Sequence, residues 1–215
     1  MNDATNNVHI LLIDNYDSFT YNLQHLIAVN RNVTLTVRRN DEDFLKEIEN
    51  GIYSGVIIGP GPGSPDDDDY FGYNRKVILE YGTKGLPILG ICLGFQGIYS
   101  CFGGTLKISQ LPVHGKVSSL QIVNDGTILS NVPNHIQVMR YHSIIAALEK
   151  EKPSCLMLNA YTFKSPSQEF NGSELMAIEH REYPIYGLQF HPESFATEYG
   201  KLMTDNFINK CITAK

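Results

Sequence analysis

Short runs of branched apolar residues alternate with helix-like apolar spacing in the first half of the chain, and this alternation limits the possible fold more than any other feature. The runs predict strands at Ile10–Ile13, Val33–Val37, Val56–Ile58 and Ile88–Ile91. Apolar residues three and four positions apart predict helices around Leu23–Ile27, Phe44–Ile48 and Val77–Tyr81. Strands of this kind, separated by helices, are typical of a parallel sheet that is covered on both faces.

The second half of the chain has a different pattern. After a helix stop at Gly103-Gly104, strand-like segments follow one another without long helices: Val117–Val123, Gln137–Tyr141, Cys155–Asn159, Leu175–Glu179 and Tyr186–Phe190. A closing amphipathic helix is predicted from Tyr199 to Phe207. We therefore expect an α/β fold with an open, mixed, largely parallel, flavodoxin-like sheet flanked by helices, and with extra antiparallel strands in the C-terminal half.

The chain is expected to form a single domain over residues 1–215, because no linker, repeat or low-complexity segment beyond Asp66–Asp69 interrupts it. Hydrophobic residues make up 42% of the sequence, which is enough to supply the core of a domain of this size.

Composition also excludes several classes of protein. The net charge is -6 and no basic cluster is present, so nucleic acid is not an expected partner. No apolar run approaches the ~18 residues that a membrane span requires. The four cysteines show no zinc spacing, and residues 1–7 contain no apolar leader segment, so we expect a cytoplasmic protein. The acidic run Asp66–Asp69 is interpreted as the start of a helix rather than a metal site.

The predicted strand Ile88–Ile91 runs into Gly90-Ile91-Cys92-Leu93-Gly94, which is the cysteine form of a nucleophile elbow. The flanking glycines permit a sharp turn, and the N-terminus of the following helix favours a thiolate at Cys92. A small buried cysteine used for strand–helix packing is the alternative interpretation.

Phe190-His191-Pro192-Glu193 follows another predicted strand. A cysteine nucleophile needs a base, and the base needs a third group that fixes its orientation. His191 and Glu193 can supply both, although a histidine before a helix-starting Pro-Glu is also common without any catalytic role.

A third motif, Gly59-Pro60-Gly61-Pro62-Gly63-Ser64-Pro65, follows the predicted strand Val56–Ile58. Alternating Gly and Pro produce a stiff loop with exposed backbone N–H groups, which suits an oxyanion hole or a carboxylate cradle. The spacing does not match a phosphate-binding P-loop, and a plain turn remains the alternative.

In this order and at these strand ends, the three motifs resemble the class I glutamine amidotransferases, whose catalytic triad is Cys, His and Glu. The resemblance covers nearly the whole chain. Four further segments resemble the branch of the family that serves chorismate enzymes, namely component II of anthranilate synthase and of aminodeoxychorismate (p-aminobenzoate) synthase: Asp14–Asn22, His114–Lys116, Arg140–Ser143 and Gln189–Ser194.

The resemblance implies Cys92 as nucleophile, His191 as base and Glu193 as the group that orients it. It also implies an oxyanion hole formed by the backbone N–H groups of Gly61 and Leu93. The residues it implies around the substrate L-glutamine are Gly61, Gly63, Gln96, Ser143 and Ile144. The ammonia would pass to a chorismate-using synthase, as a separate subunit or a fused domain, and no metal or organic cofactor is implied.

The sequence departs from the family pattern at a few positions. Phe95 stands where many relatives have His, Ile144 where many have Leu, and the segment Thr162–Ser173 is longer than in many relatives. His142 could be mistaken for the base, but we expect a structural role because no carboxylate follows it to orient its imidazole.

The expected reaction is hydrolysis of the glutamine side-chain amide to glutamate and ammonia. Two alternatives stay open: a free-standing Cys-His-Glu hydrolase acting on another amide or ester, and an inactive partner-binding module of the same fold. The segment Tyr183–Gly187 and Phe195 favour aminodeoxychorismate over anthranilate as the product.

Overall fold

The computed structural model describes residues 7–30, 32–162 and 173–214. Its strands are β1 (Val8–Asp14), β2 (Val33–Arg39), β3 (Gly55–Ile58), β4 (Ile88–Ile91), β5 (Leu106–Ile122), β6 (Gln137–Ala146), β7 (Leu156–Thr162), β8 (Leu175–His180) and β9 (Ile185–Leu188). Its α-helices are α1 (Thr20–Ala28), α2 (Leu45–Glu49), α3 (Asp68–Phe71), α4 (Asn74–Lys76), α5 (Leu93–Cys101) and α6 (Gly200–Thr213). A π-helical turn (Val77–Tyr81) and a 3-10 turn (Gly82–Lys84) continue α4.

Within these residues the strands form one mixed sheet in the order β2-β1-β3-β4-β9-β8-β7-β5-β6. β2, β1, β3, β4 and β9 pair in parallel. β9, β8, β7, β5 and β6 pair antiparallel. The expected α/β fold is therefore confirmed, and β9 is the strand that joins the parallel and antiparallel parts.

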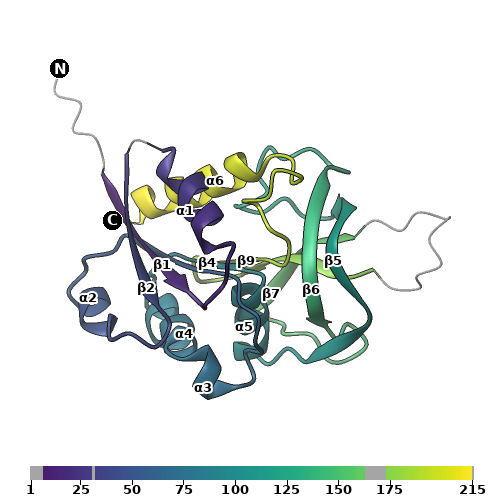
Figure 1. Cartoon of the computed structure of the whole chain (residues 1–215), viewed down its shortest axis with the longest axis horizontal. Helices are drawn as coiled ribbons and strands as arrows, with labels where there is room; N and C mark the ends of the chain where they lie inside the picture. Colours follow the sequence, from purple (N-terminus) through teal and green to yellow (C-terminus); the bar gives the residue numbers. More distant parts are fainter. Residues whose placement is uncertain (1–6, 31, 163–172, 215) are drawn as a thin grey trace.

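Helices cover both faces of the parallel part, because side chains of buried strands alternate between two apolar layers. Ile10 and Leu12 of β1 pack toward α1 and α6, whereas Leu11 and Ile13 pack toward α5 and the π-helical turn. Figure 1 shows α1 and α6 on one side of the sheet and α3, α4 and α5 on the other.

β5 and β6 extend the sheet beyond its helix-covered part, at the side of the molecule opposite β2 (Figure 1). The sequence predicted only the second part of β5, and it predicted a β6 that ends at Tyr141 rather than Ala146. The closing helix was predicted to begin at Tyr199, next to the observed start of α6 at Gly200, but α6 continues beyond the predicted end at Phe207 to Thr213. No helix in the described part of the chain is both long enough and apolar enough to cross a membrane.

Candidate active site

Cys92 occupies the sharp turn between β4 and α5. Its backbone has φ 53° and ψ -98°, a conformation that side-chain-bearing residues rarely adopt. The glycines on either side are required by close packing: a Cβ on Gly90 would lie 2.4 Å from the carbonyl carbon of Gly94. One on Gly94 would lie 2.4 Å from the carbonyl oxygen of Ile58. The turn predicted from the Gly-x-Cys-x-Gly motif is present, and it places the thiol at the start of α5.

His191 and Glu193 follow β9 and form a buried pair. Nδ1 of His191 lies 2.6 Å from Oε1 of Glu193, and the two side chains are 4% and 0% exposed. The His191 N–H donates to the carbonyl oxygen of Met139 in β6, and the Thr197 hydroxyl donates to the His191 carbonyl oxygen. The ring of Phe19 packs against the imidazole at 5.4 Å between centroids. The imidazole is therefore held in one orientation.

The electrostatics of His191 favour a charged imidazole. Burial alone would lower the pKa of His191, but the nearby Cys92 and Glu193 outweigh burial and raise that pKa to about 10. Nδ1 is engaged by Glu193, whereas Nε2 is buried and makes no hydrogen bond within the described residues. Nε2 is thus the ring nitrogen that is available to exchange a proton.

The Gly59–Pro65 loop lies against the start of α5. A Cβ on Gly61 would come within 2.6 Å of Cδ2 of Leu93 and 2.8 Å of Cβ of Asn15. The structure therefore brings together the two residues whose N–H groups are predicted to form the oxyanion hole. Gly63 packs against the ring of Tyr70, which would lie 2.2 Å from a Cβ at that position.

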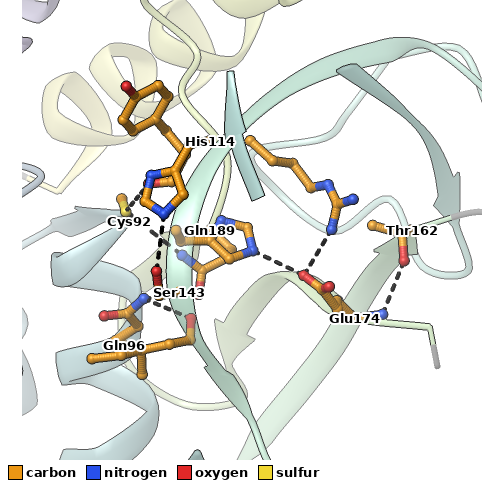
Figure 2. Close-up of polar contacts among 11 residues, drawn as sticks. Cys92, Gln96, His114, Ser143, Thr162, Glu174 and Gln189 are labelled. Atoms are coloured by element: carbon orange, nitrogen blue, oxygen red, sulfur yellow. Dashed lines mark hydrogen bonds and ion pairs between the residues drawn. The ribbon is translucent and has the colours of Figure 1, made fainter. Parts of the chain in front are cut away.

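The remaining predicted glutamine-binding residues lie near Cys92. Nε2 of Gln96 donates to the carbonyl oxygen of Ile144 at 3.0 Å and to Oε1 of Gln189 at 3.3 Å. Nε2 of Gln189 in turn points to the Cys92 sulfur at 3.7 Å. Ser143 pairs with His114 at 3.1 Å. Figure 2 shows Cys92, Gln96, Ser143 and Gln189 close together.

Gln189 and Tyr141 are residues of the site that the sequence did not single out. Gln189 links Cys92 to Gln96, and the carbonyl oxygen of Tyr141 lies 3.9 Å from the Cys92 sulfur. Both lie inside motifs that marked the chorismate branch, and adjacency to His191 was the signal available for Gln189.

Contrary to the expectation from the sequence, a carboxylate does orient the ring of His142. Nε2 of His142 lies 2.9 Å from Glu174, and Glu174 also pairs with Arg140 at 2.8 Å, as Figure 2 shows around the labelled Glu174. Burial lowers the pKa of His142 despite this carboxylate. The expected structural role agrees with these contacts, since both partners of Glu174 come from β6.

Two departures from the family pattern fall in different places. Phe95 is fully buried in the core and stacks on Tyr99 at 6.5 Å between centroids. Most of the segment Thr162–Ser173 lies outside the described residues. Where the chain is described again, the Glu174 N–H donates to the Thr162 hydroxyl at 2.9 Å. Among the described residues, no group of three or more His, Cys, Asp or Glu is arranged to hold a metal ion.

Comparison with known proteins identifies the family of the chain. The family model "Glutamine amidotransferase class-I" matches residues 11–211. The "Anthranilate synthase component 2" of Leptospira biflexa is 40% identical over 205 residues, which cover 93% of this chain and 98% of that protein. The "Aminodeoxychorismate/anthranilate synthase component 2" of Bacillus subtilis is 42% identical over 201 residues, which cover 93% and 95%.

A solved structure of a glutamine amidotransferase from Thermotoga maritima superposes with a TM-score of 0.75 at 16% identity and covers 96% of this chain and 98% of that one. This likeness concerns the fold. With a family model that spans almost the whole sequence and relatives at about 40% identity over nearly their full length, the chain belongs to the class-I glutamine amidotransferase family.

Proposed function

We propose that this chain is the glutaminase subunit of a chorismate-aminating synthase, and that Cys92, His191 and Glu193 are its catalytic triad. The observation that carries the proposal is the strained Cys92 turn beside a buried His191–Glu193 pair separated by 2.6 Å. Relatives that are named component 2 of anthranilate or aminodeoxychorismate synthase support the choice of partner.

The first half of the reaction forms a thioester. The charged His191, whose pKa is raised to about 10, supports a thiolate at Cys92, and the thiolate attacks the amide carbon of glutamine. Negative charge moves to the amide oxygen, where the N–H groups of Gly61 and Leu93 receive it. The C–N bond then breaks while Nε2 of His191 gives its proton to the departing ammonia, which leaves a γ-glutamyl thioester.

The second half restores the enzyme. Neutral His191 takes a proton from water, the resulting hydroxide attacks the thioester, and the C–S bond breaks to release glutamate and the Cys92 thiolate. Glu193 holds Nδ1 throughout, so Nε2 faces the reacting atoms in both halves. Each group returns to its starting protonation state.

The ammonia is consumed by the synthase. Ammonia that escapes at pH 7 is protonated and loses its nucleophilicity, so direct delivery to a docked partner makes chemical sense. The partner is therefore proposed to cover the surface near the Gly59–Pro65 loop and Cys92.

The test combines the full chain with its co-purifying synthase, chorismate and glutamine, and identifies the aminated product by mass spectrometry. The proposal is supported if one glutamate forms for each molecule of aminodeoxychorismate or anthranilate. The identity of this product decides between the two pathways. Turnover of other amides or esters without a partner, together with indifference to glutamine, would instead support a free-standing hydrolase. Binding to the synthase without any glutamine turnover would support an inactive partner-binding module.

A further inference from the structure

Tyr70, at the centre of the short helix α3, contacts both glycines of the Gly59–Pro65 loop that matter for the proposed chemistry. Its hydroxyl oxygen lies 3.0 Å from the point that a Cβ on Gly61 would occupy. Its ring carbons lie 2.2 Å from the corresponding point on Gly63. Glycine at both positions therefore makes room for Tyr70, which packs against the loop.

The Tyr70 hydroxyl is also linked to the loop through Asn15, the residue that follows β1. It donates to the carbonyl oxygen of Asn15 at 2.8 Å, and the Asn15 side chain donates to the carbonyl oxygen of Gly59 at 2.8 Å. The buried Asn74 donates to the Asn15 side-chain oxygen at 2.6 Å. Because Asn15 and Asn74 are fully buried, these hydrogen bonds are shielded from water and hold the Asn15 side chain in place.

Tyr70 itself is fixed from both sides. Its backbone N–H donates to the side chain of Asp67, which caps α3, and its carbonyl oxygen accepts from the side chain of Asn40 at 2.7 Å. Arg75 pairs with Asp68 and donates to the carbonyl oxygen of Pro65. The end of the loop and the helix that carries Tyr70 are thus held together.

We propose that Tyr70 is a positioning residue that sets the orientation of the Gly61 peptide and thereby aims its N–H group at the oxyanion. The inference rests on the proposed function, since it assigns a role to the Gly61 N–H. Gly61 has no side chain that could hold its peptide in one orientation, so contacts from another residue must do so. Tyr70 provides these contacts through its hydroxyl, its ring and its hydrogen bond to Asn15.

A residue that positions the oxyanion N–H stabilises the transition state more than it stabilises bound glutamine, because the negative charge exists only in the transition state. Loss of one oxyanion donor lowers kcat by about 100- to 1000-fold, and misaiming a donor that is still present is expected to lower it less. Tyr70→Phe should therefore lower the kcat of glutamine hydrolysis about tenfold and change KM less than twofold.

The experiment measures glutaminase kcat and KM of the full chain with the synthase present, for wild type, Tyr70→Phe and Tyr70→Leu. Tyr73→Phe is the matched control, because it removes a tyrosine hydroxyl from the next helical turn, where the Tyr73 ring packs on Phe44. Alkylation of Cys92 by iodoacetamide is measured in parallel. This displacement forms no oxyanion, so its rate should stay within twofold of wild type in every variant.

The expected result is a lower kcat in Tyr70→Phe, at least as large a decrease in Tyr70→Leu, and unchanged values in Tyr73→Phe. A kcat within twofold of wild type in Tyr70→Phe overturns the proposal, as does a parallel loss of alkylation, which would indicate a general disturbance at Cys92. A lower KM with unchanged kcat in Tyr70→Leu would show that Tyr70 obstructs glutamine instead. If wild type hydrolyses no glutamine, the proposed function fails and this inference fails with it.

Discussion

At the scale of single residues, the two ring nitrogens of His191 have different roles in the candidate site. Nδ1 is occupied by Glu193 at 2.6 Å, while Nε2 is left without a hydrogen bond among the described residues. A carboxylate that holds one nitrogen both orients the ring and stabilises its positive charge. His142 also has one ring nitrogen on a carboxylate and the other without a hydrogen bond among the described residues, but burial lowers its pKa. The raised pKa of His191 and its position near Cys92 therefore make His191 the residue suited to proton transfer.

Cys92→Ser should lower glutamine-dependent synthesis at least a thousandfold and leave ammonia-dependent synthesis by the partner intact, because only the ammonia source is lost. Serine is nearly isosteric, so the free energy of unfolding should change by less than ~1 kcal/mol. Product formation with glutamine and with ammonium salts measures the two activities. Glutamine use at a tenth of the wild-type rate would exclude Cys92 as the nucleophile.

The pH dependence of Cys92 labelling follows from the pKa of His191. Because that pKa is raised to about 10, the imidazole stays charged through neutral pH, and an electrophilic glutamine analogue should label Cys92 rapidly at pH 7. Glu193→Gln removes one cause of the raised pKa, so the charge is lost at lower pH and labelling at pH 7 should slow severalfold. The two proteins should converge by about pH 10, where wild-type His191 also loses its proton.

The other thiols provide the control in the same experiment. Burial raises the pKa of Cys101 to about 11 and that of Cys211 to about 12, so both should remain unlabelled at pH 7. Mass spectrometry of the labelled peptides reports each cysteine separately. Equal labelling of Cys92 and Cys101 would count against a special environment at the turn.

At the scale of secondary-structure elements, β6 connects the candidate site to the antiparallel half of the sheet. Three of its backbone carbonyl groups face the site: Met139 accepts from His191, Tyr141 lies near Cys92, and Ile144 accepts from Gln96. Arg140 and His142 of the same strand are held by Glu174. The register of β6 therefore affects the nucleophile, the base and the proposed glutamine pocket together.

The packing of α5 on β3 gives a stability prediction. Gly94→Ala should lower the free energy of unfolding by about 1–3 kcal/mol, because the added methyl would meet the Ile58 backbone, which cannot move aside as a side chain can. Urea unfolding measures the change. Asn22→Ala on the exposed side of α1 is the control and should stay within about 0.5 kcal/mol of wild type.

The sequence predicted the elements whose signals are local. The strand before Cys92, the strand before His191 and the loop at Gly61 all carry motifs within a few residues, so the parts of the candidate site were recognisable. The partnership of His142 with Glu174 was missed because it spans 32 positions and depends on the pairing of β5, β6, β7 and β8. The first part of β5 was missed because its exposed Ile108, its bulge and Pro112 obscure strand alternation.

At the scale of the whole molecule, the proposed partner should control the glutaminase. The isolated chain is expected to be a poor glutaminase, and the synthase with chorismate bound should raise kcat/KM at least tenfold, about 1.4 kcal/mol at the transition state. The physical reason is that a small change in the Gly61 peptide decides whether the oxyanion hole is formed, and docking over the loop can favour the competent state.

Steady-state glutaminase assays with and without the synthase and chorismate measure this effect. The control is Cys92 alkylation by iodoacetamide, which should respond less to the partner than glutamine hydrolysis does. Equal kcat/KM under all conditions would exclude control through the loop and leave the triad assignment standing.

The left-handed backbone at Cys92 implies that the protein gives up some stability in order to keep its proposed nucleophile. With φ at 53°, a side chain at this position strains the folded chain, and glycine would relieve that strain. Replacing alanine by glycine usually destabilises a protein, yet here Cys92→Gly should be about 1 kcal/mol more stable than Cys92→Ala, as thermal unfolding of the two inactive variants can measure. Selection for catalysis has then kept a residue that selection for heat resistance alone would discard.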